Sequence, residues 1–197
     1  MISKKFIINS CKLALKEDFY GCKYTSSRIK TKKSWKYGRF EIRAKLPQGI
    51  GTWAAFWGLP TEWKYGNWPN SGEIDVLEHV GFEEGHIVSS IHNIAHHGDL
   101  SGSDQTKYVI AKNVVNSFND YVLEWDEKDI KTFINDKLIF SYPKNDQPWE
   151  RWPFDEKFHF ILNIAIGGNW GGMKGIDDTA FPTKMEVEHF RVYKKKI

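Results

Sequence analysis

Cysteine is scarce in this chain of 197 residues, and its two copies, Cys11 and Cys22, do not have the spacing of a metal-binding pair. The sequence leaves a disulfide and two free thiols equally open. Long apolar runs are lacking as well, because none approaches the length of a membrane-spanning helix. This excludes a protein that crosses a membrane with helices, and we expect no membrane partner.

Charge of one sign is also in short supply, because the formal net charge is only +3. Dedicated binders of nucleic acid or anionic membranes concentrate basic residues, so we expect neither partner. The basic end, Lys194 to Lys196, is interpreted as a solvated tail. The first residues include lysines but only a three-residue apolar run, too short for the core of a signal peptide. This lack leaves the native compartment open.

Aromatic residues, in contrast, are plentiful: the chain has 13 Phe, 8 Tyr and 9 Trp. A core of this size does not usually need nine tryptophans, so we expect some of them on a binding surface. The length fits one domain with a full core. No internal repeat or low-complexity linker divides the chain, and we therefore treat residues 1–197 as a single domain.

Apolar residues recur mostly with a period of two. In "YGRFEIRAKLP", Phe40, Ile42 and Ala44 alternate with charged residues, and "FHFILNIAI" alternates in the same way. Gly, Asn and Asp punctuate the chain at short intervals, and no segment has a convincing helical period. Residues 96–116 are read as a loop with one short strand. This pattern predicts an all-β fold, a sandwich or jelly roll of antiparallel strands.

Three carboxylates stand close together in "GEIDVLEHV", residues 72–80. In a regular strand Glu73 and Asp75 share one face, whereas Glu78 points to the other, where burying its charge is costly. A β-bulge at Val76–Leu77 would shift the phase by one residue and return Glu78 to the face of the other two acids. A solvated edge strand that carries charges is the plain alternative for these letters alone.

Tryptophans surround the acidic segment in the sequence. In "GTWAAFWGLP" the alternation places Trp53 and Trp57 on one face with a small residue between them. Trp68 and Trp170 stand in glycine-rich loops, where an exposed indole is expensive unless something stacks on it. Asn163 shares a strand face with small residues, which fits the floor of a cleft, although a hydrogen-bonded strand asparagine is the alternative. Together these residues favour a sugar-binding cleft over the edge-strand interpretation.

At this point the chain resembles glycoside hydrolase family 16, and in particular its laminarinase-like endo-β-1,3-glucanases. The resemblance covers residues 24–193 and rests on the segments "YTSSRIKT", "YGRFEIRAKLPQGIGTWAAFWGLP", "NWPNSGEIDVLEHVG", "FNDYVLEWDEKDIKTFINDK", "WPFDEKFHFILNIAIGGNWGG" and "FPTKMEVEHFRVY". The six-residue Glu-x-Asp-x-x-Glu signature matches the bulged subgroup of the family. The resemblance implies a β-jelly-roll sandwich of two antiparallel sheets, a concave substrate cleft and a retaining mechanism.

The resemblance also implies roles for the three acids, and elementary chemistry agrees with them. A retaining glycosidase needs two carboxyls, one as nucleophile and one as acid/base. Glu73 is the expected nucleophile and Glu78 the expected acid/base, while Asp75 would hydrogen-bond Glu73 and hold its orientation. Three carboxyls this close cannot all ionise cheaply, so at least one pKa is expected to rise. A raised pKa would help to keep Glu78 protonated before the first step.

Further positions match the family's cleft one at a time, and we expect them to bind substrate: Arg28, Trp53, Trp57, Trp68, His92, Asn163 and Trp170. A surface strand arginine is an equally good interpretation of Arg28 by residue type. His79, directly after Glu78, is expected to face away from it in a structural role. His86, His96 and His97 have no role that the sequence supports and are interpreted as exposed loop residues.

The chain departs from the family pattern at its beginning and at a metal position. Family domains usually begin with one or two further strands, so this domain is expected to be N-terminally short, with an unpaired edge or a different repair of that edge. A structural calcium is common on the convex side of the family fold. Its C-terminal acidic position reads Glu188 here, followed by His189, and the sequence does not favour the metal. We expect no required cofactor and no catalytic metal.

The function expected from the resemblance is endo-hydrolysis of β-1,3-glucosidic bonds in laminarin-type or mixed-linkage β-glucans by a monomeric extracellular or periplasmic protein. A β-glucan-binding protein that keeps the fold with impaired catalysis is one alternative, and a family relative acting on agarose, porphyran or carrageenan is another. A metalloprotein that uses Glu73, Asp75 and Glu78 as ligands would leave the tryptophans unexplained. A neutral glucan is favoured because only Arg28 places a basic residue in the expected cleft.

Overall fold

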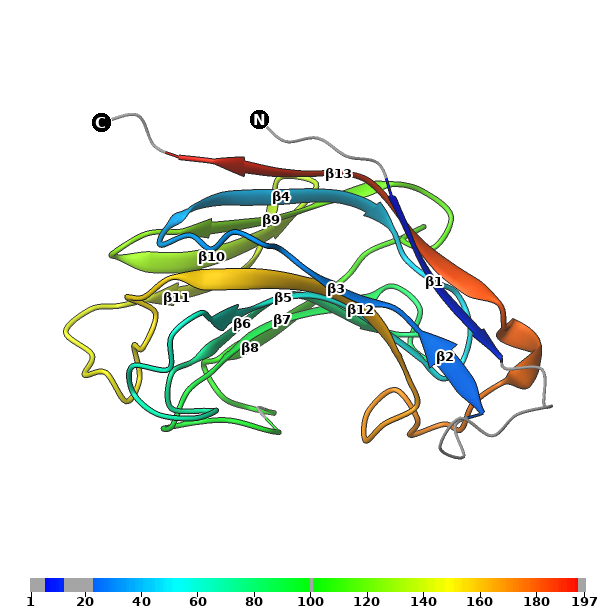
Figure 1. Ribbon diagram of the computed structural model, residues 1–197, viewed down its shortest axis with the longest axis horizontal. Coiled ribbons are helices and arrows are strands. Elements are labelled where there is room, and N and C mark those ends of the chain that lie inside the picture. The colour runs from blue at the N-terminus through cyan, green and yellow to red at the C-terminus, as the bar shows by residue number, and fades with distance from the viewer. Residues whose placement is uncertain (1–5, 13–22, 100, 195–197) are drawn as a thin grey trace.

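The computed structural model describes residues 6–12, 23–99 and 101–194, and the side chains of residues 6–12 are not among the described parts. The chain folds into two antiparallel sheets that arch over one another, with loops extending below the concave side (Figure 1). The described residues form strands, apart from the short 3-10 helix η1 (Asp178–Ala180) and the connecting loops. The predicted all-β sandwich is therefore confirmed.

One sheet has seven strands and the other has six. In spatial order, the seven-stranded sheet consists of β11 (Lys137–Pro143), β10 (Asp129–Ile134), β9 (Asn119–Trp125), β4 (Gly38–Lys45), β13 (Thr183–Tyr193), β1 (Phe6–Lys12) and β2 (Tyr24–Ser26). The six-stranded sheet consists of β3 (Arg28–Lys30), β12 (Phe158–Ile166), β5 (Thr52–Pro60), β6 (Glu73–Val80), β7 (His86–His92) and β8 (Thr106–Ile110). Strand β8 follows a loop, as the sequence predicted for residues 96–116.

The core lies between the two sheets and follows from the alternation of apolar residues along the strands. Phe40 and Ile42 of β4 point inward and are fully buried, while the charged residues between them point outward. The rings of Phe40 and Phe160 meet across the sheets with their centroids 4.3 Å apart. Burying one such ring contributes roughly 1.5–3 kcal/mol, so this inner face holds the two sheets together.

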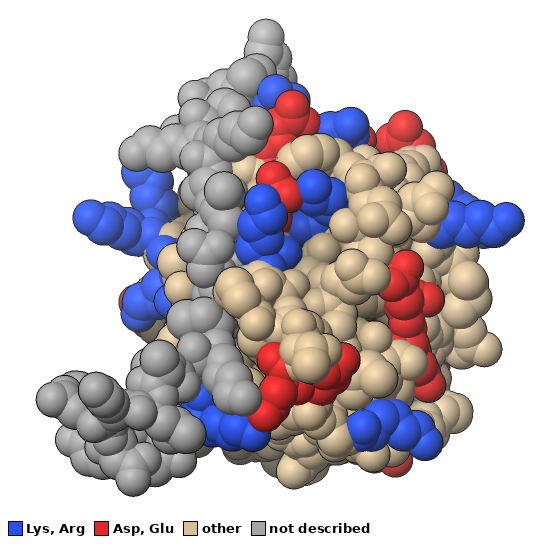
Figure 2. Space-filling model, turned by 90° about the vertical axis from the view of Figure 1, so that its right-hand side faces the viewer, with Lys and Arg blue, Asp and Glu red and all other residues tan. Residues whose placement is uncertain are grey.

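The outer face of the seven-stranded sheet carries a ladder of opposite charges. Arg39 pairs with Glu124 at 2.7 Å, and Arg43 pairs with both Asp120 at 2.9 Å and Glu188 at 2.7 Å. Such half-exposed pairs are each worth only about 0–1 kcal/mol, so they set surface character more than stability. On the side of the molecule seen in Figure 2, basic and acidic side chains likewise lie next to one another.

Strands β1 and β2 extend the seven-stranded sheet beyond β13, and the N-terminally short domain stays a prediction. Strand β1 pairs with β13, with Phe6 opposite Val187, and β2 pairs in turn with β1. The backbone of β13 therefore has a partner on each side. The state of the thiols of Cys11 and Cys22 lies outside the described residues. No helix in the described part of the chain is long and apolar enough to cross a membrane.

Candidate active site

The acidic segment forms strand β6, and this strand carries the predicted bulge. Toward β5, Leu77 pairs with Phe56 and Asp75 pairs with Trp57, so Val76 has no partner in that register. Toward β7, Asp75 pairs with Ser90 and the register then shifts before Glu78. Val76 and Leu77 are both almost completely buried. The extra residue therefore turns two successive apolar side chains inward and restores Glu78 to the concave face.

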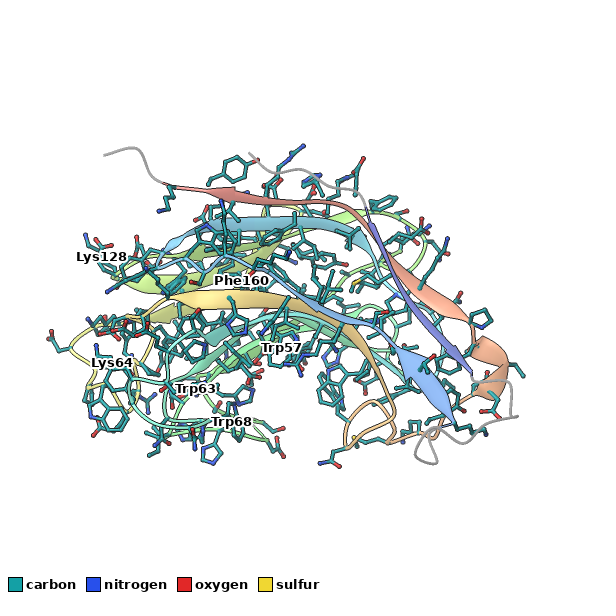
Figure 3. The ribbon with its side chains drawn as sticks, viewed as in Figure 1. Trp57, Trp63, Lys64, Trp68, Lys128 and Phe160 are labelled. Atoms are coloured by element: carbon teal, nitrogen blue, oxygen red, sulfur yellow. The ribbon has the colours of Figure 1, made fainter. Side chains whose placement is uncertain are left out.

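The three acids line one hollow on the concave side of the six-stranded sheet. Its volume is about 240 Å³, and its walls come from β5, β6 and β12. The lining residues are Trp53, Ala55, Trp57, Glu73, Asp75, Glu78, Asn163 and Ala165. The solvated edge-strand interpretation of β6 is therefore wrong, because β6 lies in the middle of the sheet with its carboxyls in a hollow. In Figure 3, Trp57 and Trp68 lie on this side, whereas Phe160 lies between the sheets.

Two indole N–H groups hold the two glutamates from opposite ends of the hollow. Trp68 donates to Oε2 of Glu73 at 2.8 Å, and Trp53 donates to Oε1 of Glu78 at 3.0 Å. Both bonds favour the charged form of the carboxyl that accepts them. Trp68 comes from the loop before β6 and remains 45% exposed, so part of its ring is open to a ligand. The tryptophans thus bind the acids as well as shaping the hollow.

Ser90 is a member of the site that the sequence analysis missed. Its hydroxyl lies 3.2 Å from Oδ2 of Asp75 and 3.5 Å from Oε2 of Glu78, within hydrogen-bond reach of both. Ser90 stands two positions before His92, so strand parity places it on the same face as a residue already expected in the cleft. The alternation along the strand therefore predicts that Ser90 faces the cleft, but a serine alone does not indicate a role in the site.

The acids titrate far from their ordinary range because they are buried together. Burial raises the pKa of Glu73 to about 8, and the charge of Asp75 adds to the rise. Burial raises the pKa of Glu78 to about 7, while the ring of His92 and the bond from Trp53 oppose the rise. Burial and the charge of Glu78 hold the pKa of Asp75 well above its usual range. The expected rise in pKa is confirmed, and the site keeps protons near neutral pH.

The remaining predicted cleft residues gather around the same hollow. Trp57 donates to Oδ1 of Asn163 at 2.7 Å, and the guanidinium of Arg28 lies over the Trp57 ring at 4.8 Å from its centroid. Nε2 of His92 lies 3.3 Å from Oδ2 of Asp75. Trp170 packs edge-on against Trp53 with a centroid distance of 5.5 Å, so it supports a wall of the hollow.

The four histidines expected in a structural role or in exposed loops lie in three environments. His79 is fully buried, and its Nε2 accepts a bond from the backbone N–H of Gly85, so its predicted structural role is confirmed. His96 and His97 lie in an exposed loop, as expected. The loop interpretation of His86 is wrong. It begins strand β7, it is partly buried and its Nδ1 lies 2.9 Å from a Glu83 carboxyl oxygen, because the turn after β6 ends at Gly85 and the strand begins directly after it.

Among the residues that the structure describes, two groups of side chains have the spacing of a metal site. In the hollow, Glu73, Asp75 and His92 bring their ligand atoms within 4.8 Å of one another, and on the outer face Glu41, Asp120 and His189 do the same. The outer trio lies in the ladder of charges, where arginines already neutralise its carboxylates.

Glu188, at the position of the family's calcium ligand, is paired with Arg43 at 2.7 Å. This pairing occupies the Glu188 carboxylate, and the absence of a calcium ion from the protein stays a prediction.

Comparison with known proteins agrees with this architecture. The profile of the family described as "Glycosyl hydrolases family 16" matches residues 3–188. The chain belongs to this family. The beta-glucanase of Rhodothermus marinus is 42% identical over 187 residues, which cover 90% of this chain and 65% of that protein. The crystal structure of the laminarinase from Rhodothermus marinus has a TM-score of 0.89 and 41% identity, and the match covers 96% of this chain and 77% of that chain.

A second curated relative is glucan endo-1,3-beta-glucosidase A1 of Niallia circulans. It is 37% identical over 185 residues, which cover 88% of this chain and 27% of that protein. The family 16 domain described here therefore spans less than two thirds of the length of either curated relative. The resemblance to family 16 is confirmed over the body of the chain, while the role of each site residue stays a prediction.

Proposed function

We propose that this family 16 domain is a retaining endo-glycosidase that hydrolyses internal β-1,3-glucosidic bonds of laminarin-type or mixed-linkage β-glucans. The observation that carries the proposal is that Glu73, Asp75 and Glu78 line one tryptophan-walled hollow in the middle of the concave sheet. The printed names of its relatives, a beta-glucanase, a laminarinase and a glucan endo-1,3-beta-glucosidase, support the substrate class.

In the proposed first step Glu73 attacks the anomeric carbon while Glu78 protonates the departing oxygen. Glu78 must therefore begin protonated, and a pKa of about 7 keeps most of it so in mildly acidic solution. Glu73 must begin as a carboxylate although burial raises its pKa to about 8, and the N–H of Trp68 favours that charged form. Glu73 and Asp75 are hydrogen-bonded to each other, so the proton that this pair retains has to reside on Asp75 during attack.

In the second step Glu78, now a carboxylate, takes a proton from the incoming water, and the water cleaves the bond between the sugar and Glu73. The N–H of Trp53 and the hydroxyl of Ser90 stabilise the charge that Glu78 acquires between the two steps. The ring of His92 lies against Asp75 and supports the pair on the other side. The chain's own residues thus supply both proton transfers without a required cofactor.

The substrate is proposed to be a neutral glucan that stacks on Trp57 and Trp68. Arg28 lies over Trp57, where its guanidinium is placed to donate to sugar hydroxyls. The described residues that line the hollow include no lysine or arginine, so they do not form the cluster of cations that a sulfated galactan would recruit. A glucan-binding protein without catalysis is not favoured, because all three acids are in place and the pKa of each is raised. Proteins of that kind have no use for a buried acid cluster.

Product profiling under one set of conditions tests the proposal. The wild-type protein and the Glu73→Gln variant are incubated with laminarin, mixed-linkage glucan, agarose and carrageenan, each with and without a chelator. We expect laminari-oligosaccharides from the wild type, insensitivity to the chelator, and loss of most activity in a folded Glu73→Gln variant. Binding without release would support the binding-protein alternative, and cleavage of agarose or carrageenan alone would contradict the proposed substrate.

A further inference from the structure

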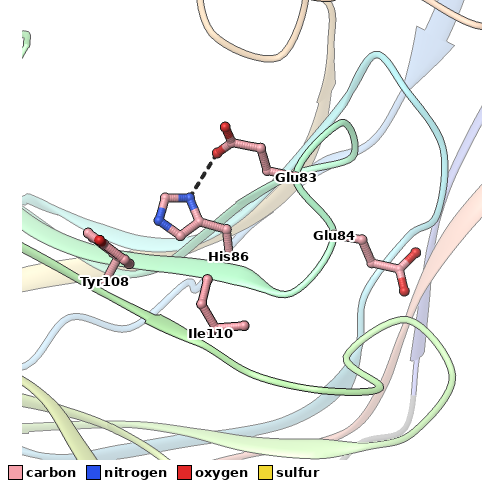
Figure 4. A pocket seen from close by; sticks show the side chains of 5 residues that line it. All are labelled: Glu83, Glu84, His86, Tyr108 and Ile110. Atoms are coloured by element: carbon pink, nitrogen blue, oxygen red, sulfur yellow. Dashed lines mark hydrogen bonds and ion pairs between the residues drawn. The ribbon is translucent and has the colours of Figure 1, made fainter.

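A second hollow lies on the concave face, beyond the acids and toward the edge of the six-stranded sheet. Its volume is about 450 Å³, and Figure 4 shows the side chains that line it, which are Glu83, Glu84, His86, Tyr108 and Ile110. Tyr108 and Ile110 are each 66% exposed, which makes them the most exposed pair of apolar side chains on one described strand. A large exposed aromatic side chain beside a cleft calls for a ligand that covers it.

The strand register connects this hollow to the acid/base residue. Glu78 of β6 is opposite Val88 of β7, and Val88 is opposite Tyr108 of β8. Side chains that are directly opposite in an antiparallel pair point to the same face, so the three form one row across the concave surface. Neighbouring strands are about 4.8 Å apart, which places the Tyr108 position about 10 Å from that of Glu78. A short oligosaccharide bridges this distance.

The row extends away from one group of residues expected to bind sugar, and it crosses β7, which carries another of them, His92. Trp57, Asn163 and Arg28 belong to β5, β12 and β3, which follow β6 in one direction across the sheet, whereas Tyr108 lies in the other direction. An enzyme that cuts inside a chain has to hold sugar residues on both sides of the broken bond. The departing segment begins beside Glu78, because Glu78 protonates the departing oxygen, and its path across β7 leads to Tyr108.

The ring of Tyr108 is held in place before any ligand arrives. The His86 ring packs edge-on against it, with centroids 4.4 Å apart and planes at 68°. His86 is in turn fixed by Glu83, whose carboxyl oxygen lies 2.9 Å from its Nδ1 (Figure 4). A ring fixed in this way loses little conformational freedom when a ligand stacks on it. Glu83 and Glu84 add acceptors for sugar hydroxyls and repel an anionic chain.

We infer that Tyr108 and Ile110 form a subsite for the departing segment of the glucan, with Glu84 beside it as an acceptor for sugar hydroxyls. The inference rests on the proposed endo-glucanase function and assigns that function an additional binding region for neutral sugars two strands away from the acids. Its occupant is a neutral β-glucan segment that continues from the site of cleavage.

The test compares substrates that do and do not reach Tyr108. Tyr108→Ala, Tyr108→Phe and the wild type are assayed on laminari-oligosaccharides of increasing length and on an aryl β-glucoside oligomer whose leaving group is a small phenol. Leu138→Ala is the matched control, because Leu138 is 49% exposed on β11, in the other sheet. We expect Tyr108→Ala to lower kcat/KM on the long oligosaccharides about tenfold, equivalent to ~1.4 kcal/mol, and to shift the bond that is cut.

The same variant is expected to match the wild type on the aryl substrate, since no sugar then extends past Glu78. Tyr108→Phe keeps the ring and is expected to behave as the wild type on both substrates, as is Leu138→Ala. Equal losses on both substrates, or no loss on either, would overturn the inference. A change in the size of the protein in solution without a change in kinetics would also overturn it, and would assign the patch to self-association. If the wild type itself released no sugar, the proposed function would have failed instead.

Discussion

Replacing Trp53 with phenylalanine removes one hydrogen bond from the acid/base residue and keeps an aromatic ring in the wall of the hollow. The indole N–H of Trp53 donates to Oε1 of Glu78 at 3.0 Å and lowers the pKa of that carboxyl. A hydrogen bond to a charged group contributes roughly 1.5–3 kcal/mol, and about 1.4 kcal/mol corresponds to one pKa unit. The pKa of Glu78 should therefore rise from about 7 by roughly one to two units.

The sign of the effect on rate follows from the state that the first step needs. Glu78 has to be protonated when it meets the departing oxygen, so kcat/KM falls as the pH rises through its pKa. Without the bond from Trp53 the protonated form persists to higher pH. The alkaline limb of the pH profile should thus move upward by about one to two pH units, whatever happens to the height of the profile.

The assay is the pH dependence of kcat/KM on a soluble laminari-oligosaccharide. Trp57→Phe is the matched control, because the Trp57 indole lines the same hollow but donates to Asn163 and not to a carboxyl of the acid cluster. Its alkaline limb should stay where the wild-type limb lies. An unmoved or lowered limb in Trp53→Phe would refute the reasoning, because the bond to Glu78 would then not control the proton that catalysis uses.

Two further predictions concern the acids themselves. Glu78→Ala should lose most activity on an aryl substrate with an activated leaving group. Azide should restore its turnover, because azide attacks the glycosyl intermediate without base catalysis. A variant that azide does not rescue would contradict the role of Glu78. The pKa values of Glu73 and Glu78 are raised on folding, so the folded protein binds more protons than the unfolded chain and stability should fall between about pH 5 and 8. Urea midpoints across this range should therefore decrease with pH, and less steeply in Glu73→Gln, whereas equal slopes would contradict the burial of Glu73.

Local alternation made the centre of the site predictable from the sequence. The positions of Trp53 and Trp57 followed from a period of two, and the bulge followed from the mismatch between that period and Glu78. These inferences needed only the direction in which neighbouring side chains of one strand point. The core positions of Phe40 and Ile42 were predictable for the same reason.

Pairing between distant strands was not predictable in the same way. Strand parity puts Ser90 on the face of His92, but its contact with the acids depends on the register in which β7 lies beside β6, and Tyr108 faces the cleft only because β8 then pairs with β7. The sequences of the paired strands do not by themselves determine either register. His86 shows the same limit, because its place in a strand and its contact with Tyr108 depend on a tight turn whose length the sequence did not reveal.

The bulge in β6 has a consequence for how related chains are compared. A strand without the extra residue would present the same three acids with the last one four positions after the first and not five, because every second side chain already shares a face. Two relatives could therefore superpose all three carboxyls in space while a column-by-column alignment opens a gap between Asp75 and Glu78. An insertion or deletion at Val76 would change the number of apolar side chains that β6 directs into the core. The three acids on the concave face of the strand would be preserved.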